Sequence, residues 1–245
     1  DTSIMRTIAL PSMLEILSRN NAYHNKAAKL YEIATVYLPV EGQRLPEEPK
    51  KLVFGSYGEK ETFFRLKGEL EAVFAGLRMK KASYAAEKNN PSYHPGRCAS
   101  IWFDGVEVGV MGQVHPLVAK NYGIDTEVYC AELNLTKMFD LRLPEPTFAP
   151  LPKYPAVSRD LALVCDEALT VAQVEDAITA AAGKLLRKIQ LFDIYRGVGI
   201  PEGKKSMAFS LELRADDRTL TDSDSEKVVA DVLAALKEKL NATLR

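Results

Sequence analysis

A proline-rich segment limits this chain to two folding units. Residues 143–155 carry five of the chain's 13 prolines. Proline fixes φ and has no backbone N–H to donate, so such a stretch runs extended over a surface. The total of 245 residues is enough for two ordinary domains. We therefore predict a domain over residues 1–142, a linker over 143–155 and a second domain over 156–245.

Composition places the chain among globular proteins of a reducing compartment. It is 47% hydrophobic and 27% charged, and it has no apolar run of the roughly 18 residues that a membrane span needs. Three widely spaced cysteines without a CxxC pair predict buried thiols and a cytoplasmic location. The sequence starts without methionine and shows no signal peptide, so we expect a fragment of a longer protein with no membrane partner.

The charge balance excludes a surface that binds phosphates broadly. The formal net charge is −1, and the part after Pro150 holds 14 basic against 15 acidic residues. Non-specific binding to nucleic acid depends on many cationic contacts. We therefore expect no DNA partner, and any contact with RNA must come from a local patch.

The first domain has the pattern of a mixed α+β module built on an antiparallel sheet. Asp104-Gly105 is a strong two-residue hairpin signal between two strand patterns. Helices are predicted over residues 11–20, 62–77 and shortly after 116, and strands over 30–36, 51–55, 100–103, 107–113 and 128–133.

The second domain has the element order βαββαβ. Strands are predicted over residues 160–165, 188–195, 205–214 and 242–244, and helices over 170–182 and 221–240. This order is that of a ferredoxin-like domain, in which both helices cover one face of the sheet. The other face is left open.

Two of these strands place an unusual set of side chains on the open face. Alternation predicts Phe192 and Ile194 on the core face, with Asp193 and Tyr195 on the opposite face beside Ser206. An aromatic ring on a platform of small and polar residues can stack on a nucleic-acid base. Basic residues flank these strands at Lys184, Arg187, Lys188, Arg196, Lys204 and Lys205. The alternative is a solvated rim with the tyrosine packed on a neighbouring domain.

No motif of the chain indicates a metal site or a catalytic centre. His24, His94 and His115 lack the spacing of zinc ligands. The sequence also lacks the phosphate-binding GxxxxGK[ST], the dinucleotide-binding GxGxxG and the GxSxG nucleophile elbow. We assign no catalytic and no metal-binding residue.

Both halves of the chain carry longer strings that match one family. In the second domain these are Tyr154–Ala162, Leu191–Tyr195, Pro201–Ser206 and Arg218–Asp222. In the first domain they are Ser3–Thr7, Leu10-Pro11, Tyr31–Ile33, Leu66–Glu71, His94–Arg97 and Gly109–Pro116. In this order and spacing the chain resembles the C-terminal part of the β subunits of bacterial phenylalanyl-tRNA synthetases.

The resemblance implies a division of labour between the two domains. The first is similar to a class II synthetase core that has lost catalysis: Arg6 and Glu32 match its second motif, but no arginine-ending, glycine-rich third motif follows. The second is similar to an anticodon-binding domain. The family enzyme is an α2β2 ligase that uses ATP and magnesium in its catalytic α subunit. The implied partners are phenylalanine tRNA, the α subunit and a second β subunit, and the fragment itself is expected to be inactive and without a cofactor.

The resemblance also implies roles for single residues. Tyr195 is similar to the tyrosine that stacks on the first anticodon base, and Asp193 and Ser206 match positions that contact this base or its neighbour. Lys205 joins them as a candidate cation. Arg196 departs from the acidic residue of relatives, and we assign it a phosphate contact from its charge alone.

Two other functions are open at this point. Both domains could serve only as an assembly scaffold, with the open sheet face covered by protein. A small-molecule sensor of ferredoxin-like fold would need a pocket at the sheet, for which the sequence has no sign.

Overall fold

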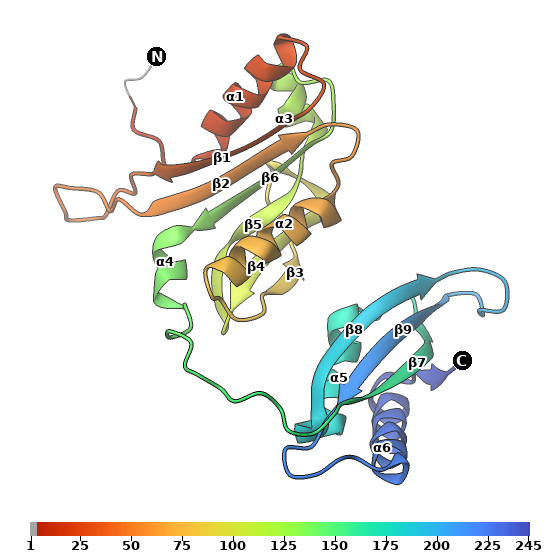
Figure 1. Cartoon of the computed structure of the whole chain (residues 1–245). Coiled ribbons are helices and arrows are strands. Elements are labelled where there is room, and N and C mark those ends of the chain that lie inside the picture. Colours follow the sequence, from red (N-terminus) through yellow and green to blue (C-terminus); the bar gives the residue numbers. More distant parts are fainter. Residues whose placement is uncertain (1–3) are drawn as a thin grey trace. The chain divides into compact units, whose positions relative to one another are not determined.

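The computed structural model describes residues 4–245 and divides the chain into two compact units. Unit 1 ends at Pro146, and unit 2 spans Thr147–Arg245. Each unit has hydrophobic clusters of its own, and each is described by itself (Figure 1). Ser3, part of one quoted motif, lies outside the described residues.

Unit 1 is built on a six-stranded antiparallel sheet with the order β1-β2-β6-β5-β4-β3. Its strands are β1 (Ala28–Thr35), β2 (Lys50–Tyr57), β3 (Ser83–Ala86), β4 (Tyr93–Phe103), β5 (Val106–Val114) and β6 (Val128–Asn134). Its helices are α1 (Leu10–Ala22), α2 (Phe63–Gly76), α3 (Pro116–Asn121) and α4 (Leu135–Asp140). The predicted hairpin is confirmed: Asp104 and Gly105 both have positive φ between β4 and β5.

Helices cover both faces of this sheet. Alternate residues of β6 belong to different clusters: Cys130 packs with α1 and α3, whereas Ala131 packs with α2 and α4. α1 packs closely on the sheet at Gly55, where an added Cβ would lie 2.6 Å from the Cγ atom of Met13. The two clusters together make unit 1 a three-layer α+β domain.

Unit 2 is a four-stranded antiparallel sheet with the order β10-β7-β9-β8. Its strands are β7 (Val157–Asp166), β8 (Leu186–Tyr195), β9 (Lys204–Leu213) and β10 (Thr243–Leu244). Its helices are α5 (Val171–Ala182) and α6 (Asp222–Leu240), with a single 3-10 turn, η1 (Gly183–Leu185), before β8. The predicted βαββαβ order and ferredoxin-like fold are confirmed.

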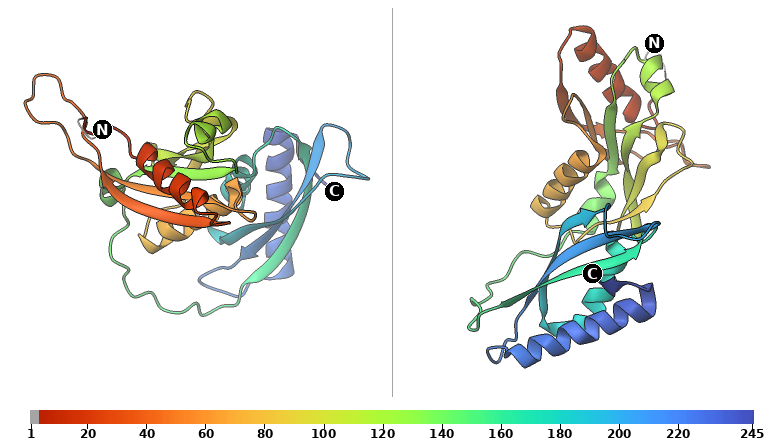
Figure 2. Two further views of the ribbon diagram at one scale, coloured as in Figure 1. Left: turned by 90° about the horizontal axis from the view of Figure 1, so that it is seen from above. Right: turned by 90° about the vertical axis from the view of Figure 1, so that its right-hand side faces the viewer.

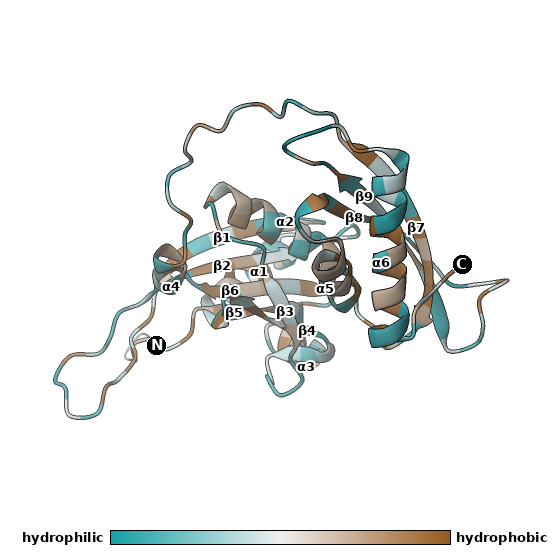
Figure 3. Ribbon diagram, turned by 90° about the horizontal axis from the view of Figure 1, so that it is seen from below, coloured by the Kyte–Doolittle hydropathy of each residue, from teal (hydrophilic) through white to brown (hydrophobic). Residues whose placement is uncertain are grey.

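Both helices of unit 2 lie on one face of its sheet (Figures 1 and 2). Each begins at a threonine capping box, Thr170 with Gln173 and Thr221 with Asp224, which satisfies backbone N–H groups at the helix start. Brown and teal segments alternate along α6 in Figure 3, as expected of a helix with one buried stripe. The fully buried centre consists of Leu163, Cys165, Val174, Ile178, Met207, Phe209, Leu211, Leu213, Val232 and Leu236.

Between α4 and β7 the described chain has neither helix nor strand. This stretch contains the proline-rich segment, whose missing donors and fixed φ angles exclude it from both units' sheets.

Candidate nucleic-acid interface

The strand register of unit 2 determines which side chains share the open face. Tyr195 pairs with Ser206, Ser206 with Val164, and Val164 with Thr243, so these four form one row across the sheet. Directly paired residues of an antiparallel sheet point to the same side. The neighbouring row contains Met207, which points to the helices and is fully buried.

The adjacent row on the open face combines small and charged residues. Asp193 pairs with Ala208 and Ala208 with Ala162. The backbone N–H of Arg245, directly after β10, donates to the carbonyl of Ala162 at 2.9 Å and continues this row. The row therefore carries a carboxylate at one edge and a guanidinium at the other, with two methyl groups between.

A β-bulge in β8 corrects the predicted position of Phe192. The register shifts between Leu191 and Asp193, so Phe192 has no direct partner on β9. Leu191, opposite the buried Phe209, packs against the core in its place, and Phe192 is 56% exposed. Phe192 does not join the core as predicted, because the extra residue of the bulge places Leu191 opposite Phe209 and leaves Phe192 without a partner at the edge of the sheet. Ile194 keeps its predicted side, opposite Met207.

Tyr195 lies at the end of β8 and keeps 37% of its surface exposed. Its hydroxyl donates a long hydrogen bond of 3.4 Å to the carbonyl of Val198. Gly197 lies against the phenol end, where an added Cβ would be 2.7 Å from Oη. The guanidinium carbon of Arg245 lies 5.1 Å from the ring centroid, within the range of a cation–π contact.

Two predicted site residues converge on Glu167 instead of the open face. Arg196 Nε and Nη2 donate to the Glu167 carboxylate at 2.7–3.1 Å, and Lys205 Nζ donates to the Glu167 carbonyl at 2.8 Å. The Arg196 guanidinium holds the pKa of the Glu167 carboxyl below its ordinary value. Lys205 is buried, and its register opposite Cys165 places it on the helix side of the sheet. These contacts tie the start of the β8–β9 loop, where Arg196 follows Tyr195, to Glu167.

The three remaining predicted residues come together on the open face. Asp193 is exposed. Ser206 is only 4% exposed although no helix covers its side of the sheet. Its small side chain lies between Tyr195 and Val164 in the same row, which accounts for the burial.

Arg245 is a residue of this face that sequence reasoning missed. Its position depends on the pairing of the two-residue strand β10 with β7, which no sequence pattern of that length specifies. Several cations of the predicted basic patch are also paired internally: Arg187 with Asp216 at 2.7 Å and Lys204 with Asp166 at 3.6 Å. The surface is therefore less basic than the sequence implies.

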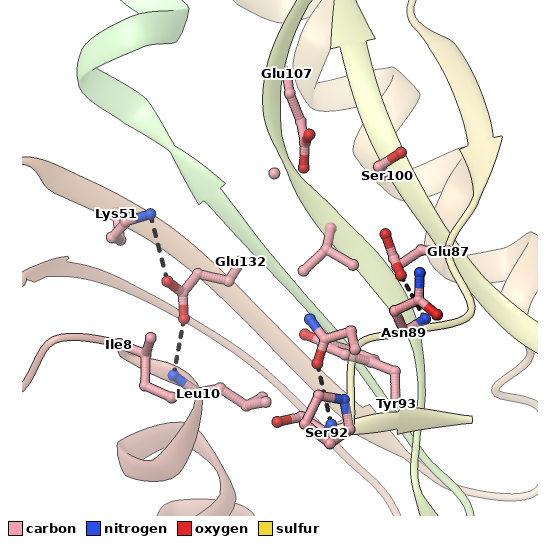
Figure 4. Close-up of a pocket in the computed structure, with 14 residues that line it drawn as sticks. Ile8, Leu10, Lys51, Glu87, Asn89, Ser92, Tyr93, Ser100, Glu107 and Glu132 are labelled. Atoms are coloured by element: carbon pink, nitrogen blue, oxygen red, sulfur yellow. Dashed lines mark hydrogen bonds and ion pairs between the residues drawn. The ribbon is translucent and has the colours of Figure 1, made fainter. Parts of the chain in front are cut away.

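Unit 1 contains a cavity of about 520 Å³ that is lined by residues of β4, β5 and β6 and by Leu10 at the start of α1 (Figure 4). Three carboxylates line it, from Glu87, Glu107 and Glu132, together with the single cation of Lys51. Glu132 accepts from the backbone N–H groups of Ala9 and Leu10 at 3.0 Å and pairs with Lys51 at 3.5 Å. This carboxylate therefore anchors the start of α1.

The lining of this cavity does not fit ATP. A triphosphate needs unpaired cations or a row of free N–H donors, whereas here Lys51 is paired and the other charged groups are carboxylates. Arg6, which resembles a class II motif residue, is absent from the lining. It donates to Glu32 at 3.0 Å, to Ser12 and to the Thr35 carbonyl. Among residues 4–245 no cluster of His, Cys, Asp and Glu has the arrangement to hold a metal ion.

Within the part of the chain that the structure describes, no helix combines the length and apolarity needed to cross a membrane.

Family models match both units. Residues 1–135 match the phenylalanyl tRNA synthetase beta chain CLM domain, and residues 152–245 match the ferredoxin-fold anticodon binding domain. The first description is that of a domain of an aminoacyl-tRNA synthetase chain, and the second is that of an anticodon-binding domain. A pyrrolysyl-tRNA synthetase structure from Desulfitobacterium hafniense overlaps 54% of this chain and 48% of its own at 15% identity, but its TM-score of 0.44 is too low to support an argument.

Relatives match over the whole length of this chain. The phenylalanine–tRNA ligase beta subunit of Clostridium tetani is 43% identical over 246 residues, and that of Clostridium acetobutylicum is 39% identical. The match covers 100% of this chain and 31% of each relative. The chain belongs to the phenylalanine–tRNA ligase beta-subunit family, and it spans about a third of the length of these relatives.

Proposed function

We propose that the open sheet face of unit 2 binds the anticodon loop of phenylalanine tRNA, as part of a ligase that joins phenylalanine to that tRNA. The observation that carries the proposal is the open face itself. Both helices lie on the other side, and Tyr195 stands on the open side half-exposed beside an exposed carboxylate. An unpaired base can stack on such a ring and present its edge to polar groups.

The proposed roles of the five site residues follow from where each lies. Tyr195 stacks on the first anticodon base, while Asp193 accepts a hydrogen bond from a base edge and Ser206 contacts the same base or its neighbour. Arg196 has a side chain that is 55% exposed even when paired with Glu167, and it contacts a backbone phosphate from that position. Lys205, on the helix side, contributes by bracing the loop that carries Arg196.

Unit 1, in this proposal, supports assembly and performs no catalysis. Its cavity has more carboxylates than cations and is unsuited to a triphosphate. ATP and magnesium act in the α subunit, and unit 1 helps to hold that subunit and a second β subunit in an α2β2 enzyme of the cytoplasm.

The substitution Tyr195→Ala in the intact enzyme tests the anticodon role. Loss of one base–aromatic stack costs about 1–3 kcal/mol, so we expect the KM for tRNA to rise by a factor between roughly 5 and roughly 150. Steady-state aminoacylation against tRNA concentration measures this. Tyr23→Ala is the matched control, because Tyr23 is a 75% exposed tyrosine of unit 1. An unchanged KM and kcat/KM for tRNA in Tyr195→Ala would refute the proposal.

One observation favours a purely structural scaffold as the second candidate. Phe192 on β8 is 56% exposed and Val198 in the β8–β9 loop is 93% exposed, and apolar side chains in such positions often meet another protein. If the edge is a subunit contact, Phe192→Ser weakens assembly measured by sedimentation. If the proposed tRNA role is correct, Tyr195→Ala raises the KM for tRNA while the assembly stays intact.

A further inference from the structure

We infer that Arg245 and Tyr195 form the two walls of a slot for a single unpaired nucleobase. The inference rests on the proposed function of the open face and adds to it a residue that the sequence motifs do not include. The guanidinium carbon of Arg245 lies 5.1 Å from the centroid of the Tyr195 ring. A planar cation over an aromatic face is itself a stacking partner for a base.

The strand order places the backbones of Arg245 and Tyr195 far apart, at opposite edges of the sheet. Arg245 follows β10, and Tyr195 lies on β8, three strand positions away across the sheet. Neighbouring strands are roughly 4.8 Å apart, so the two backbones are separated by roughly 14 Å. Only two long side chains that extend toward each other over the sheet can meet across that distance.

The residues between them leave room for this reach. Ala162 and Ala208 occupy the row that ends at Arg245, and Ser206 stands beside Tyr195. Ala208 is 9% and Ser206 4% exposed although no helix lies on their side. Because these side chains are small, the two long side chains can meet above the row, and larger residues there would block the contact.

Both walls have defined supports. The backbone of Arg245 is tied to β7 through its N–H, which donates to the Ala162 carbonyl. The Tyr195 ring is positioned at its phenol end by the Gly197 backbone and the Val198 carbonyl. Arg245 has no carboxylate partner among the ion pairs of the described residues, so its charge is directed to the ring.

The separation of the walls determines how a base can enter. Stacked bases are roughly 3.4 Å apart, so a base between two planes needs a gap of roughly 7 Å. The guanidinium carbon lies only 5.1 Å from the ring centroid, which is too close for a base to lie between the two groups in this state. A base entering it lifts the flexible Arg245 side chain by roughly 2 Å and exchanges one cation–π contact for two stacking contacts.

The test is a double-mutant cycle in the intact enzyme with phenylalanine tRNA as the probe. Arg245→Ala is expected to raise the KM for tRNA about fivefold, the size of one exposed cation–π contact. Arg245→Lys keeps the charge without the planar fork and is expected to stay at least threefold above wild type. In a Tyr195→Ala background, Arg245→Ala is expected to add less than twofold, because a slot with one wall missing has little left to lose.

Lys239→Ala is the matched control, since it removes one positive charge from the exposed surface of α6. We expect it to leave the KM for tRNA unchanged. Equal melting temperatures of all variants verify that each one folds.

The outcomes separate the slot from the anticodon role. Suppose that Tyr195→Ala raises the KM for tRNA. If Arg245→Ala then leaves this KM unchanged or lowers it, or if the fold-changes of the two substitutions multiply fully in the double variant, the slot is refuted and the anticodon role stands. Full rescue by Arg245→Lys also refutes the slot, because charge alone would then suffice. If Tyr195→Ala itself has no effect, the proposed function fails.

Discussion

Glycine at position 197 determines where the Tyr195 ring can lie. A Cβ there would be 2.7 Å from the ring's Oη and 2.9 Å from Cζ, closer than real Cβ contacts come. Its φ lies outside the left-handed range, so the need for glycine is one of space alone. The position of the stacking ring therefore depends on the absence of a single methyl group.

The variant Gly197→Ala tests this directly. The ring must move away from the added methyl group, and we expect the KM for tRNA to rise about threefold with little change in the free energy of unfolding, because the loop is exposed. Steady-state aminoacylation and thermal melting measure the two quantities. Gly68→Ala, with no atom within 4 Å of the added Cβ, is the control. A Gly197→Ala enzyme with wild-type KM would show that the ring position is unimportant.

Among the site residues, strand alternation correctly predicts Tyr195, Asp193 and Ser206 on a common face. The bulge at Phe192 escapes prediction because it adds one residue without any change in composition. Lys205 illustrates the opposite case. It has the same strand parity as the buried Met207, and this alone would have placed it on the helix side.

Several of the predicted helices have both a capping residue and an apolar stripe that packs on a sheet. The helix predicted over residues 62–77 is α2, and the one predicted to end near 240 is α6, since both have an apolar stripe and a threonine cap. β3 and α4 were not predicted. β3 is a four-residue edge strand with three exposed residues, and α4 is a six-residue helix that follows β6 without a break. Neither is long enough to show a period.

The close packing of α1 on β2 predicts that a larger residue at position 55 lowers the stability of unit 1. Gly55→Ala would bring a methyl group within 2.6–2.8 Å of Met13 and Leu17 side-chain atoms in a fully packed region. Overpacking of this kind costs about 1–3 kcal/mol of the free energy of unfolding. Denaturant unfolding followed by the fluorescence of Trp102, the chain's single tryptophan, reports on unit 1.

A double variant tests whether the added methyl group at position 55 clashes with Met13. If the added methyl group meets the Met13 side chain, Met13→Ala should cost less stability in the Gly55→Ala background than in the wild-type chain. A loss below about 0.5 kcal/mol in Gly55→Ala alone would contradict the packing account.

The whole chain combines two units with different surfaces. Unit 1 buries its sheet between helices on both faces and has three carboxylates in the lining of a cavity. Unit 2 covers one sheet face only and exposes the other. The near-neutral charge of the chain provides little general attraction for RNA, so recognition must depend on a few contacts at the open face. The boundary between these roles coincides with the proline-rich segment.

The most direct test of the anticodon role combines a change in the protein with a change in the tRNA. The values of kcat/KM are measured for wild-type and Tyr195→Ala enzyme, each with intact phenylalanine tRNA and with a tRNA lacking the first anticodon base. If the ring stacks on that base, each single change lowers kcat/KM roughly tenfold and the two together lower it no further. Losses that multiply to roughly a hundredfold would show that the ring and the base act independently, and would contradict the account.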